Sequence, residues 1–353
     1  MIVLLMHAGL SIVPGDGGVV MFFCISGYVI TAVLIRERDR TGGFDPVGFY
    51  ARRFLKLLPP LVAVLLIPTI VYATLHDVSW AAVIAQFGFS YNWVLAFAPD
   101  AAERVLPGSD VVWSLAIEEQ FYLVFGLIWL LLVRRRRWQL LTVVVAAAAL
   151  VGSFLTRVVI SWGQPANPDD WDPQALAHVL RGTDARIEAI ALGMLVAIAA
   201  DAQARRRLVV VRLAASDAAL LIAIVALPLS SILLRGDASE LVLRPTVQAL
   251  VAAVIILYGL FSADTRLRRL FDAVCGAALI QRIGLASYSI YLVHQPVFSA
   301  LSPVKEVVPG LVLLPVAVVV GVSAGLVLYR CVEVPALGIK ERYFATNLSA
   351  TSR

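Results

Sequence analysis

Four ionisable side chains stand inside strongly apolar stretches of this chain: His7, Glu118, Glu119 and His294. Ionisable groups are costly in a membrane interior, so by default they indicate a functional site. Histidine is the usual general base near neutral pH, and a base beside a carboxylate suits acid–base catalysis at a carbonyl. For His7 the alternative is a histidine that packs or caps a helix end. The residue alone does not decide between these two roles.

The glutamate pair lies in the sequence WSLAIEEQFY, residues 113–122, at the start of an apolar run. Neighbouring residues of an α-helix point about 100° apart, so Glu118 and Glu119 cannot both face lipid cheaply. The structural alternative is an ion pair with Arg157 or Arg186. We expect that role for one glutamate and an active-site role, orienting His7, for the other.

A second polar stripe, SYSIYLVHQP at residues 287–296, interrupts another apolar run. Tyr288, Tyr291 and Gln295 share one helical face at spacings of three and four, with His294 close by. Tyrosine hydroxyls in such a place can donate to an oxyanion that develops on a carbonyl. The alternative is a packing seam between helices, where polar side chains are also common.

Basic residues gather in YARRFLKLLPP, residues 50–60. Arg53 and Lys56 are three residues apart at a helix start, Arg52 adjoins them, and Arg36 lies upstream. Such a cluster can bind an anionic, phosphate-bearing ligand. The alternative is a plain cytoplasmic anchor, because loops on that side of a membrane are enriched in Lys and Arg.

The composition of the whole chain indicates the elements that hold these residues. Its 353 residues are 60% hydrophobic and 15% charged, with a mean hydropathy of +0.88. Soluble domains carry about 25% charged residues, so we predict one polytopic membrane domain over residues 1–343, with a cytoplasmic tail over residues 344–353. The three cysteines are isolated, so no metal site or disulfide framework is expected. The basic excess is read as an orientation signal, and a nucleic-acid partner is excluded.

The hydropathy pattern predicts an all-α bundle of about ten transmembrane helices with both termini cytoplasmic. Residues 1–12 are too short to cross and resemble the second half of a helix whose first half is missing. Residues 80–97 are apolar, but a full crossing there would place the arginines at residues 134–137 outside, against the positive-inside rule. That segment is therefore expected to lie on the outer side without crossing. The other expected spans cover residues 19–35, 54–75, 112–133, 138–160, 187–200, 214–234, 245–261, 283–301 and 311–328.

Seven short motifs, in the same order along the chain, resemble the acyltransferase-3 family of integral membrane acyltransferases. They are FFCISGYVIT at residues 22–31, RFLKLLP at 53–59, SYNW at 90–93, WSLAIEEQFY, RIE at 186–188 with Gly193, SYSIYLVHQP, and YRCVEVP at 329–335. This resemblance implies transfer of a short acyl group, with acetyl the first expectation, from acyl-CoA to a hydroxyl. The implied acceptors are sugars of surface polysaccharides, O-antigen or peptidoglycan, or macrolide-like glycosides. The implied location is the bacterial inner membrane, and no metal is implied.

The resemblance also implies roles for single residues. His7 matches the essential histidine of the family and would act as general base or transient acyl carrier. Glu118 or Glu119 would orient it, Tyr288 or Tyr291 would donate to the oxyanion, and His294 is a further catalytic candidate. The donor phosphates would meet Arg36, Arg52, Arg53 and Lys56; Lys56 stands where the family has a second arginine. The family arginine ten residues before the histidine has no counterpart, and the chain resembles the stand-alone form.

Two other functions fit the same pattern. A transporter or flippase for a glycan precursor would also place His and Glu within a helical bundle. An inverted repeat would favour it, and the sequence shows none. The short segment before His7 also allows a truncated, inactive acyltransferase.

Overall fold

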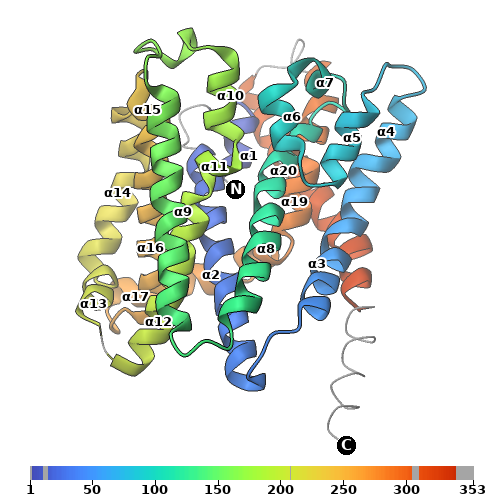
Figure 1. Cartoon of the computed structure of the whole chain (residues 1–353). Helices are drawn as coiled ribbons and strands as arrows, with labels where there is room; N and C mark the ends of the chain where they lie inside the picture. Colours follow the sequence, from blue (N-terminus) through green and yellow to red (C-terminus); the bar gives the residue numbers. More distant parts are fainter. Residues whose placement is uncertain (1, 11–14, 207, 304–309, 339–353) are drawn as a thin grey trace, which may run out of the picture.

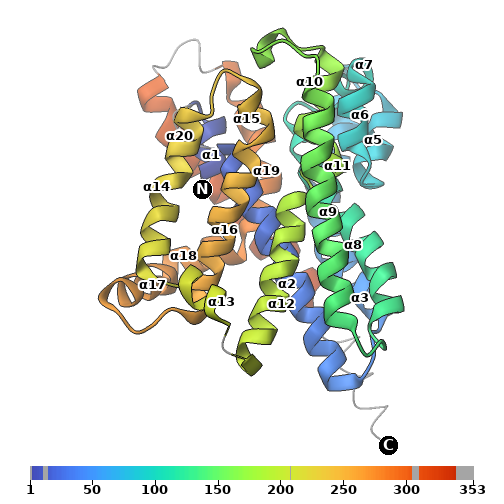
Figure 2. The ribbon, with the colours of Figure 1, turned by 60° about the vertical axis from the view of Figure 1, so that its left-hand side comes forward.

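The computed structural model describes residues 2–10, 15–206, 208–303 and 310–338. Every regular element within these ranges is a helix, and they contain no strand, as the sequence predicts. The longer helices run side by side in one bundle (Figures 1 and 2). The expected tail at residues 344–353 lies outside the described residues.

Six helical segments of the described chain are long and apolar enough to cross a membrane, which needs about 20 residues. The predicted membrane bundle is therefore supported, but the predicted count of about ten is not confirmed. Helix α14 (Asp217–Leu233) is apolar but shorter. The six are α2 (Gly15–Thr41), Pro46–Tyr72 with α3 (Pro46–Leu61) and α4 (Ile67–Tyr72), Ser109–Leu132 with α8 (Val112–Leu132), α9 (Trp138–Ser161), Ala238–Phe261 with α15 (Ala238–Val242) and α16 (Arg244–Phe261), and Leu313–Gly338, which holds most of α20 (Gly310–Leu328).

Charged helix ends, a helix break and short helix length explain why other expected spans are not among the six membrane-crossing segments. Helix α12 (Glu188–Arg206) carries ionisable residues towards both ends. The span expected at residues 283–301 is divided between α18 (Ala278–Leu285) and α19 (Ser287–Ala300), with a break at Ala286. Helix α1 (Ile2–His7) has six residues. The remaining short elements are α7 (Pro99–Glu103), α10 (Pro173–Arg181), α11 (Thr183–Arg186), α13 (Val209–Ala214) and α17 (Arg266–Gly276).

The ambiguous segment at residues 80–97 forms two short helices, α5 (Trp80–Phe87) and α6 (Tyr91–Phe97). They are separated by a turn in which Phe89 adopts a φ of 52°, a left-handed conformation that ends a regular helix. Neither helix has the length to cross. The prediction that this segment does not cross as a single helix is confirmed.

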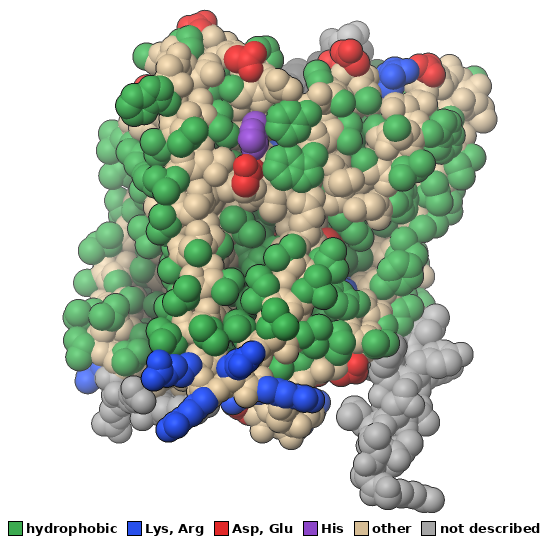
Figure 3. Space-filling view, viewed as in Figure 1, with side chains coloured by type: hydrophobic (Ala, Val, Ile, Leu, Met, Phe, Trp, Pro, Cys, Tyr) green, Lys and Arg blue, Asp and Glu red, His purple; other side chains and the backbone are tan. Residues whose placement is uncertain are grey.

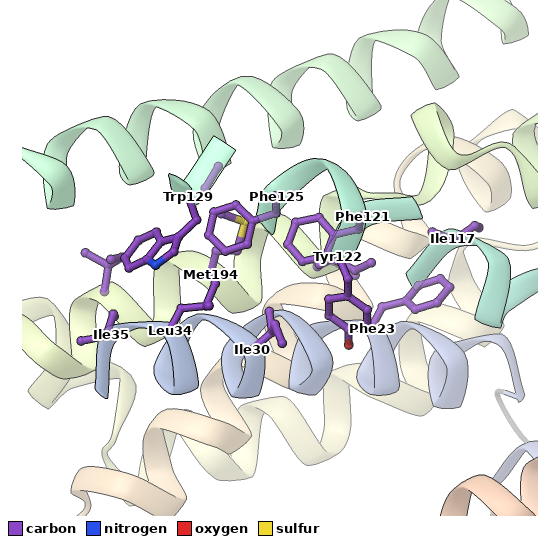
Figure 4. Packing of buried hydrophobic residues seen from close by; sticks show 14 of the residues in the cluster. Phe23, Ile30, Leu34, Ile35, Ile117, Phe121, Tyr122, Phe125, Trp129 and Met194 are labelled. Atoms are coloured by element: carbon purple, nitrogen blue, oxygen red, sulfur yellow. The ribbon is translucent and has the colours of Figure 1, made fainter. Parts of the chain in front are cut away.

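The core of the bundle lies where α2, α8 and α12 meet, and aromatic side chains fill it (Figure 4). Phe23 of α2 and Trp129 of α8 are completely buried there. Gly27 of α2 faces the carbonyl oxygen of Ile190 of α12, and any side chain at Gly27 would clash with it. Small residues at a crossing let two helix backbones approach closely, as is common in membranes. This close crossing fixes α2 against α12.

The charged side chains separate towards the two ends of the bundle. The turn between α8 and α9, with four exposed arginines at residues 134–137, lies at the same end as α13 and α17 (Figure 1). We call this the basic end; α7, α10 and α15 lie at the opposite end. Figure 3 shows Lys and Arg gathered along the basic end, Asp and Glu mostly opposite, and a hydrophobic band between them. This separation follows the positive-inside pattern.

Candidate active site

His7 is the last residue of α1, and the residues after it end the helix sharply. The amide of Gly9 donates to the carbonyl of Met6 at 3.0 Å, and the amide of Leu10 donates to that of Leu5 at 3.0 Å. This pair of bonds is the Schellman arrangement, which requires a residue with positive φ. Gly9 supplies it with a φ of 115°. The helix therefore ends at His7 and leaves its half-buried ring at the helix terminus.

The imidazole of His7 contacts that of His294 from α19. Nδ1 of His7 lies 2.9 Å from Nε2 of His294, and the two rings stack with centroids 5.2 Å apart. Nδ1 of His294 lies 2.5 Å from the carbonyl oxygen of Tyr291, one turn earlier in α19. His294 itself is completely buried.

These contacts determine which ring nitrogens carry protons when both histidines are neutral. The Tyr291 carbonyl only accepts, so Nδ1 of His294 donates to it and Nε2 of His294 is left as an acceptor. Nδ1 of His7 must then be the donor to His294. The lone pair of His7 consequently lies on Nε2. The chain from the Tyr291 carbonyl through His294 fixes this tautomer of His7, as hydrogen-bond partners do for catalytic or metal-bound imidazoles.

A polar cavity of about 160 Å³ adjoins His7, and we call it the outer cavity. Asp110 from the segment before α8 and Arg181 from the end of α10 place it toward the end opposite the basic one. Tyr291 and Gln295 also line it, as the sequence pattern expected. The lining is Met6, His7, Asp16, Val19, Asp110, Val111, Trp113, Leu180, Arg181, Arg186, Tyr291 and Gln295.

The two candidate tyrosines occupy different surroundings. The Tyr291 hydroxyl lies 2.7 Å from the hydroxyl of Ser114 and 3.2 Å from the carbonyl oxygen of Val111, beside the outer cavity. The Tyr288 hydroxyl donates to the carbonyl of Leu57 in α3 at 2.8 Å and does not line that cavity. Only Tyr291 of the pair is therefore positioned near His7.

The glutamates have other partners than expected. Glu119 forms an ion pair with Arg53 of α3, whose guanidinium also lies 3.6 Å from the ring centroid of Tyr122. The ion pair expected with Arg157 is instead made by Glu188. Helix α9 packs mainly against α12 rather than against α8, so Arg157 reaches Glu188 at the start of α12.

Glu118 lies deep in the bundle, and one of its carboxylate oxygens has no hydrogen-bond partner among the described residues. It follows Ser114 by one turn and precedes Tyr122 by one turn on the same face of α8. The Tyr122 hydroxyl bonds to Ser26 of α2. The structure gives His7 a ring partner in His294 and not in either glutamate, so the expectation of an orienting glutamate is corrected.

A larger cavity of about 580 Å³ lies between α3, the α5–α6 turn and α8, and we call it the α3–α8 cavity. Its lining is mostly apolar, and Arg53 and Glu119 are its charged members. Of the other expected donor-binding residues, Arg36 and Lys56 are exposed and Arg52 is half-buried. None of these three lines the cavity.

Sequence reasoning missed Ser114 and the two cavity aspartates, Asp16 and Asp110. Ser114 lies one turn before Glu118 on the same face of the predicted helix, and this spacing could have identified Ser114 as a site residue. The aspartates carry no such signal, because only the fold brings the start of α2 beside the segment before α8.

The fold and site together define a helical membrane protein whose polar centre places a histidine beside a cavity away from its basic end. The chain belongs to the acyltransferase family whose model, described as "Acyltransferase domain", matches residues 3–330.

Its curated relatives include O-acetyltransferase OatA of Staphylococcus aureus strain NCTC 8325 / PS 47, which is 27% identical over 286 residues. That match covers 79% of this chain and 45% of the relative. A putative O-acetyltransferase of Staphylococcus aureus strain COL is 31% identical over 194 residues, covering 51% of this chain and 29% of the relative. The chain thus spans less than half the length of these relatives. No solved structure matches it.

Proposed function

We propose that this protein transfers a short acyl group, acetyl by preference, from acyl-CoA to a hydroxyl of a carbohydrate or glycoside. The basic end faces the cytoplasm of a bacterial cell and receives the donor, and the outer cavity receives the acceptor from the other side. The family assignment supports acyl transfer, and the names of the relatives support acetyl as the group. The separation of charge between the two ends supports the orientation.

His7 is the general base of the proposed reaction. Its Nε2 takes the proton of the acceptor hydroxyl as that oxygen attacks the thioester carbonyl. The resulting tetrahedral species collapses with cleavage of the carbon–sulfur bond, and the CoA sulfur leaves with the proton that Nε2 returns. The product is an ester and free CoA, so the proton is conserved and no further reactant is needed.

His294 acts through His7 and is a positioning residue. It keeps Nδ1 of His7 protonated by accepting its hydrogen bond. When Nε2 of His7 takes up a proton and the ring becomes an imidazolium, Nδ1–H still donates to Nε2 of His294. Tyr291 is the better candidate for oxyanion stabilisation, since it lines the outer cavity and Tyr288 does not. Its hydroxyl would turn its proton from the Val111 carbonyl to the oxyanion. Ser114 holds the Tyr291 hydroxyl near the site.

The donor side of the proposal rests on the α3–α8 cavity. Its apolar length suits the pantetheine arm of acyl-CoA, and Arg53 with Glu119 marks its polar wall. Ser114 and Glu119 are five residues apart on α8, which is about 7.5 Å along the helix axis and about 140° around it. A thioester carried past Glu119 must therefore advance by this distance and turn around α8 to reach Tyr291. The exposed Arg36 and Lys56, with Arg52, would meet the phosphates.

The single observation that carries the proposal is the Tyr291–His294–His7 chain, which leaves Nε2 of His7 as a base. The test uses the full chain in lipid nanodiscs with isotope-labelled acetyl-CoA and a panel of oligosaccharides and glycosides. We expect labelled ester on an acceptor, detected by mass spectrometry, and its loss in His7→Ala. His76→Ala is the matched control, because His76 is an exposed histidine outside the outer cavity. Acceptor uptake by the same chain in closed proteoliposomes, without labelled ester, would favour a transporter and reject the proposal.

A further inference from the structure

Arg186 is a buried cation whose hydrogen-bonding capacity is unused. It ends helix α11, is only 8% exposed and lines the outer cavity together with His7. No hydrogen bond or ion pair joins its side chain to any residue that the structure describes. Its guanidinium lies 5.9 Å from the ring centroid of Trp113. A guanidinium carries five N–H donors, and burying them without acceptors is unfavourable.

The other buried arginine of this region shows what a structural guanidinium looks like in the same bundle. Arg157 pairs with Glu188 and also donates to the carbonyl of Ala185 at 2.8 Å and to the hydroxyl of Thr246 at 2.9 Å. The bundle thus satisfies Arg157 from within and leaves Arg186 open toward the cavity. Arg157 therefore stabilises the fold, whereas the donors of Arg186 are available to a ligand in the cavity.

The charges around the outer cavity indicate the sign of that ligand. Two arginines, Arg181 and Arg186, and two aspartates, Asp16 and Asp110, line it. The Asp16 carboxylate is bound by Arg244 at 3.1 Å, and Arg244 also pairs with Glu240 at 2.8 Å. Neither lining aspartate is paired with Arg186 among the described residues, so the N–H groups of this guanidinium stay open to an anionic ligand.

We propose that Arg186, assisted by Arg181, binds an oxyanion of the acceptor, so that the acceptor is an acidic sugar or glycoside carrying a carboxylate or a phosphate. The planar guanidinium presents parallel N–H bonds that match either group bidentately. Binding there would hold the acceptor in the cavity that contains His7 and present a neighbouring hydroxyl to its Nε2. The assignment of an acceptor to this cavity rests on the proposed function; the binding of an oxyanion does not.

The first experiment measures binding and needs no acyl transfer. Wild-type protein in nanodiscs is titrated with an acidic oligosaccharide and with the same oligosaccharide after reduction of its carboxylates, and a phosphorylated sugar is compared with its dephosphorylated form. We expect the anionic member of one pair to bind about 10- to 100-fold more tightly, the usual effect of hydrogen bonds to a charged group. The pair that discriminates identifies carboxylate or phosphate. Equal binding within both pairs overturns the proposal.

The second experiment assigns the selectivity to Arg186. Arg186→Gln is expected to lower the preference for the anionic member about 10- to 100-fold, and Arg186→Lys to restore only part of it because the ammonium lacks the planar fork. The matched control is Arg235→Gln, since Arg235 is an exposed arginine outside the outer cavity. Unchanged selectivity in a folded Arg186→Gln variant, or an equal loss in Arg235→Gln, contradicts the assignment. If anionic sugars bind selectively but no ester forms, the proposed function fails while the oxyanion site stands.

Discussion

Replacing His294 with phenylalanine isolates the role of the histidine chain. Phenylalanine keeps an aromatic ring against His7 and Phe298, which His294 contacts at centroid distances of 5.2 Å and 5.6 Å. It removes both ring nitrogens, so Nδ1–H of His7 loses its acceptor. The neutral ring of His7 is then free to adopt the other tautomer, which protonates Nε2 and turns the lone pair away from the outer cavity.

Two hydrogen bonds are lost, from His7 to His294 and from His294 to the Tyr291 carbonyl, and the first sets the expected effect on the rate. Leaving a buried donor without an acceptor costs about 1–3 kcal/mol. Since each 1.36 kcal/mol of barrier is about tenfold in rate, kcat should fall roughly 10- to 100-fold. Loss of the base itself in His7→Ala should cost about 10²- to 10⁴-fold. The apparent KM for acyl-CoA should stay within a small factor, because the affected contact lies outside the α3–α8 cavity.

The assay is steady-state acyl transfer in nanodiscs, with release of the CoA thiol as the readout and thermal unfolding as the folding check. His294→Gln is the conservative partner variant, because its amide oxygen lies where Nε2 accepts in the histidine. We expect it to recover most of the rate lost in His294→Phe. The tautomer argument would be refuted if His294→Phe were as fast as the parent. It would also be refuted if His294→Gln were no faster than His294→Phe.

Three further perturbations test the fold and its orientation. Gly27→Leu should abolish the close crossing of α2 with its neighbour and lower the unfolding temperature sharply, whereas insensitivity would mean that the crossing is loose. Arg157→Met should cost about 3–5 kcal/mol of unfolding free energy by leaving Glu188 buried and unpaired, and a neutral result would show that the carboxylate is solvated or protonated. A cysteine at Arg135 should resist membrane-impermeant thiol reagents added to whole cells, while one at Asp169 should react; the reverse pattern would invert the proposed topology.

Patterns of hydrophobicity and polar residues predicted much of the arrangement. Charge asymmetry predicted that residues 80–97 do not form a single crossing, and two short helices lie there. Helical spacing placed Tyr291 and Gln295 on one face, and both line the outer cavity. These successes depend on rules that act along the sequence, within one helix or between one loop and the next.

The partners of the charged residues were not predictable in the same way. His7 and His294 are 287 residues apart, and their contact follows from how α1 sits against α19, which no spacing encodes. Likewise Arg53 reads as a surface anchor by composition, yet the packing of α3 against α8 turns it toward Glu119. The count of about ten spans was not confirmed. One reason is the break at Ala286, which shortens a helix that hydropathy alone predicts as continuous.

The most direct test of the account is a single-turnover measurement of acetyl transfer by His7→Ala in the full chain. If His7 is the base, the variant should fold, insert and bind acyl-CoA like the parent, yet form ester on the acceptor at least about 10²-fold more slowly. Quenching the parent reaction and searching His7 for bound label separates a base, which stays unlabelled, from a transient acyl carrier. Ester formation by His7→Ala at a rate close to that of the parent would contradict the mechanism proposed for this site.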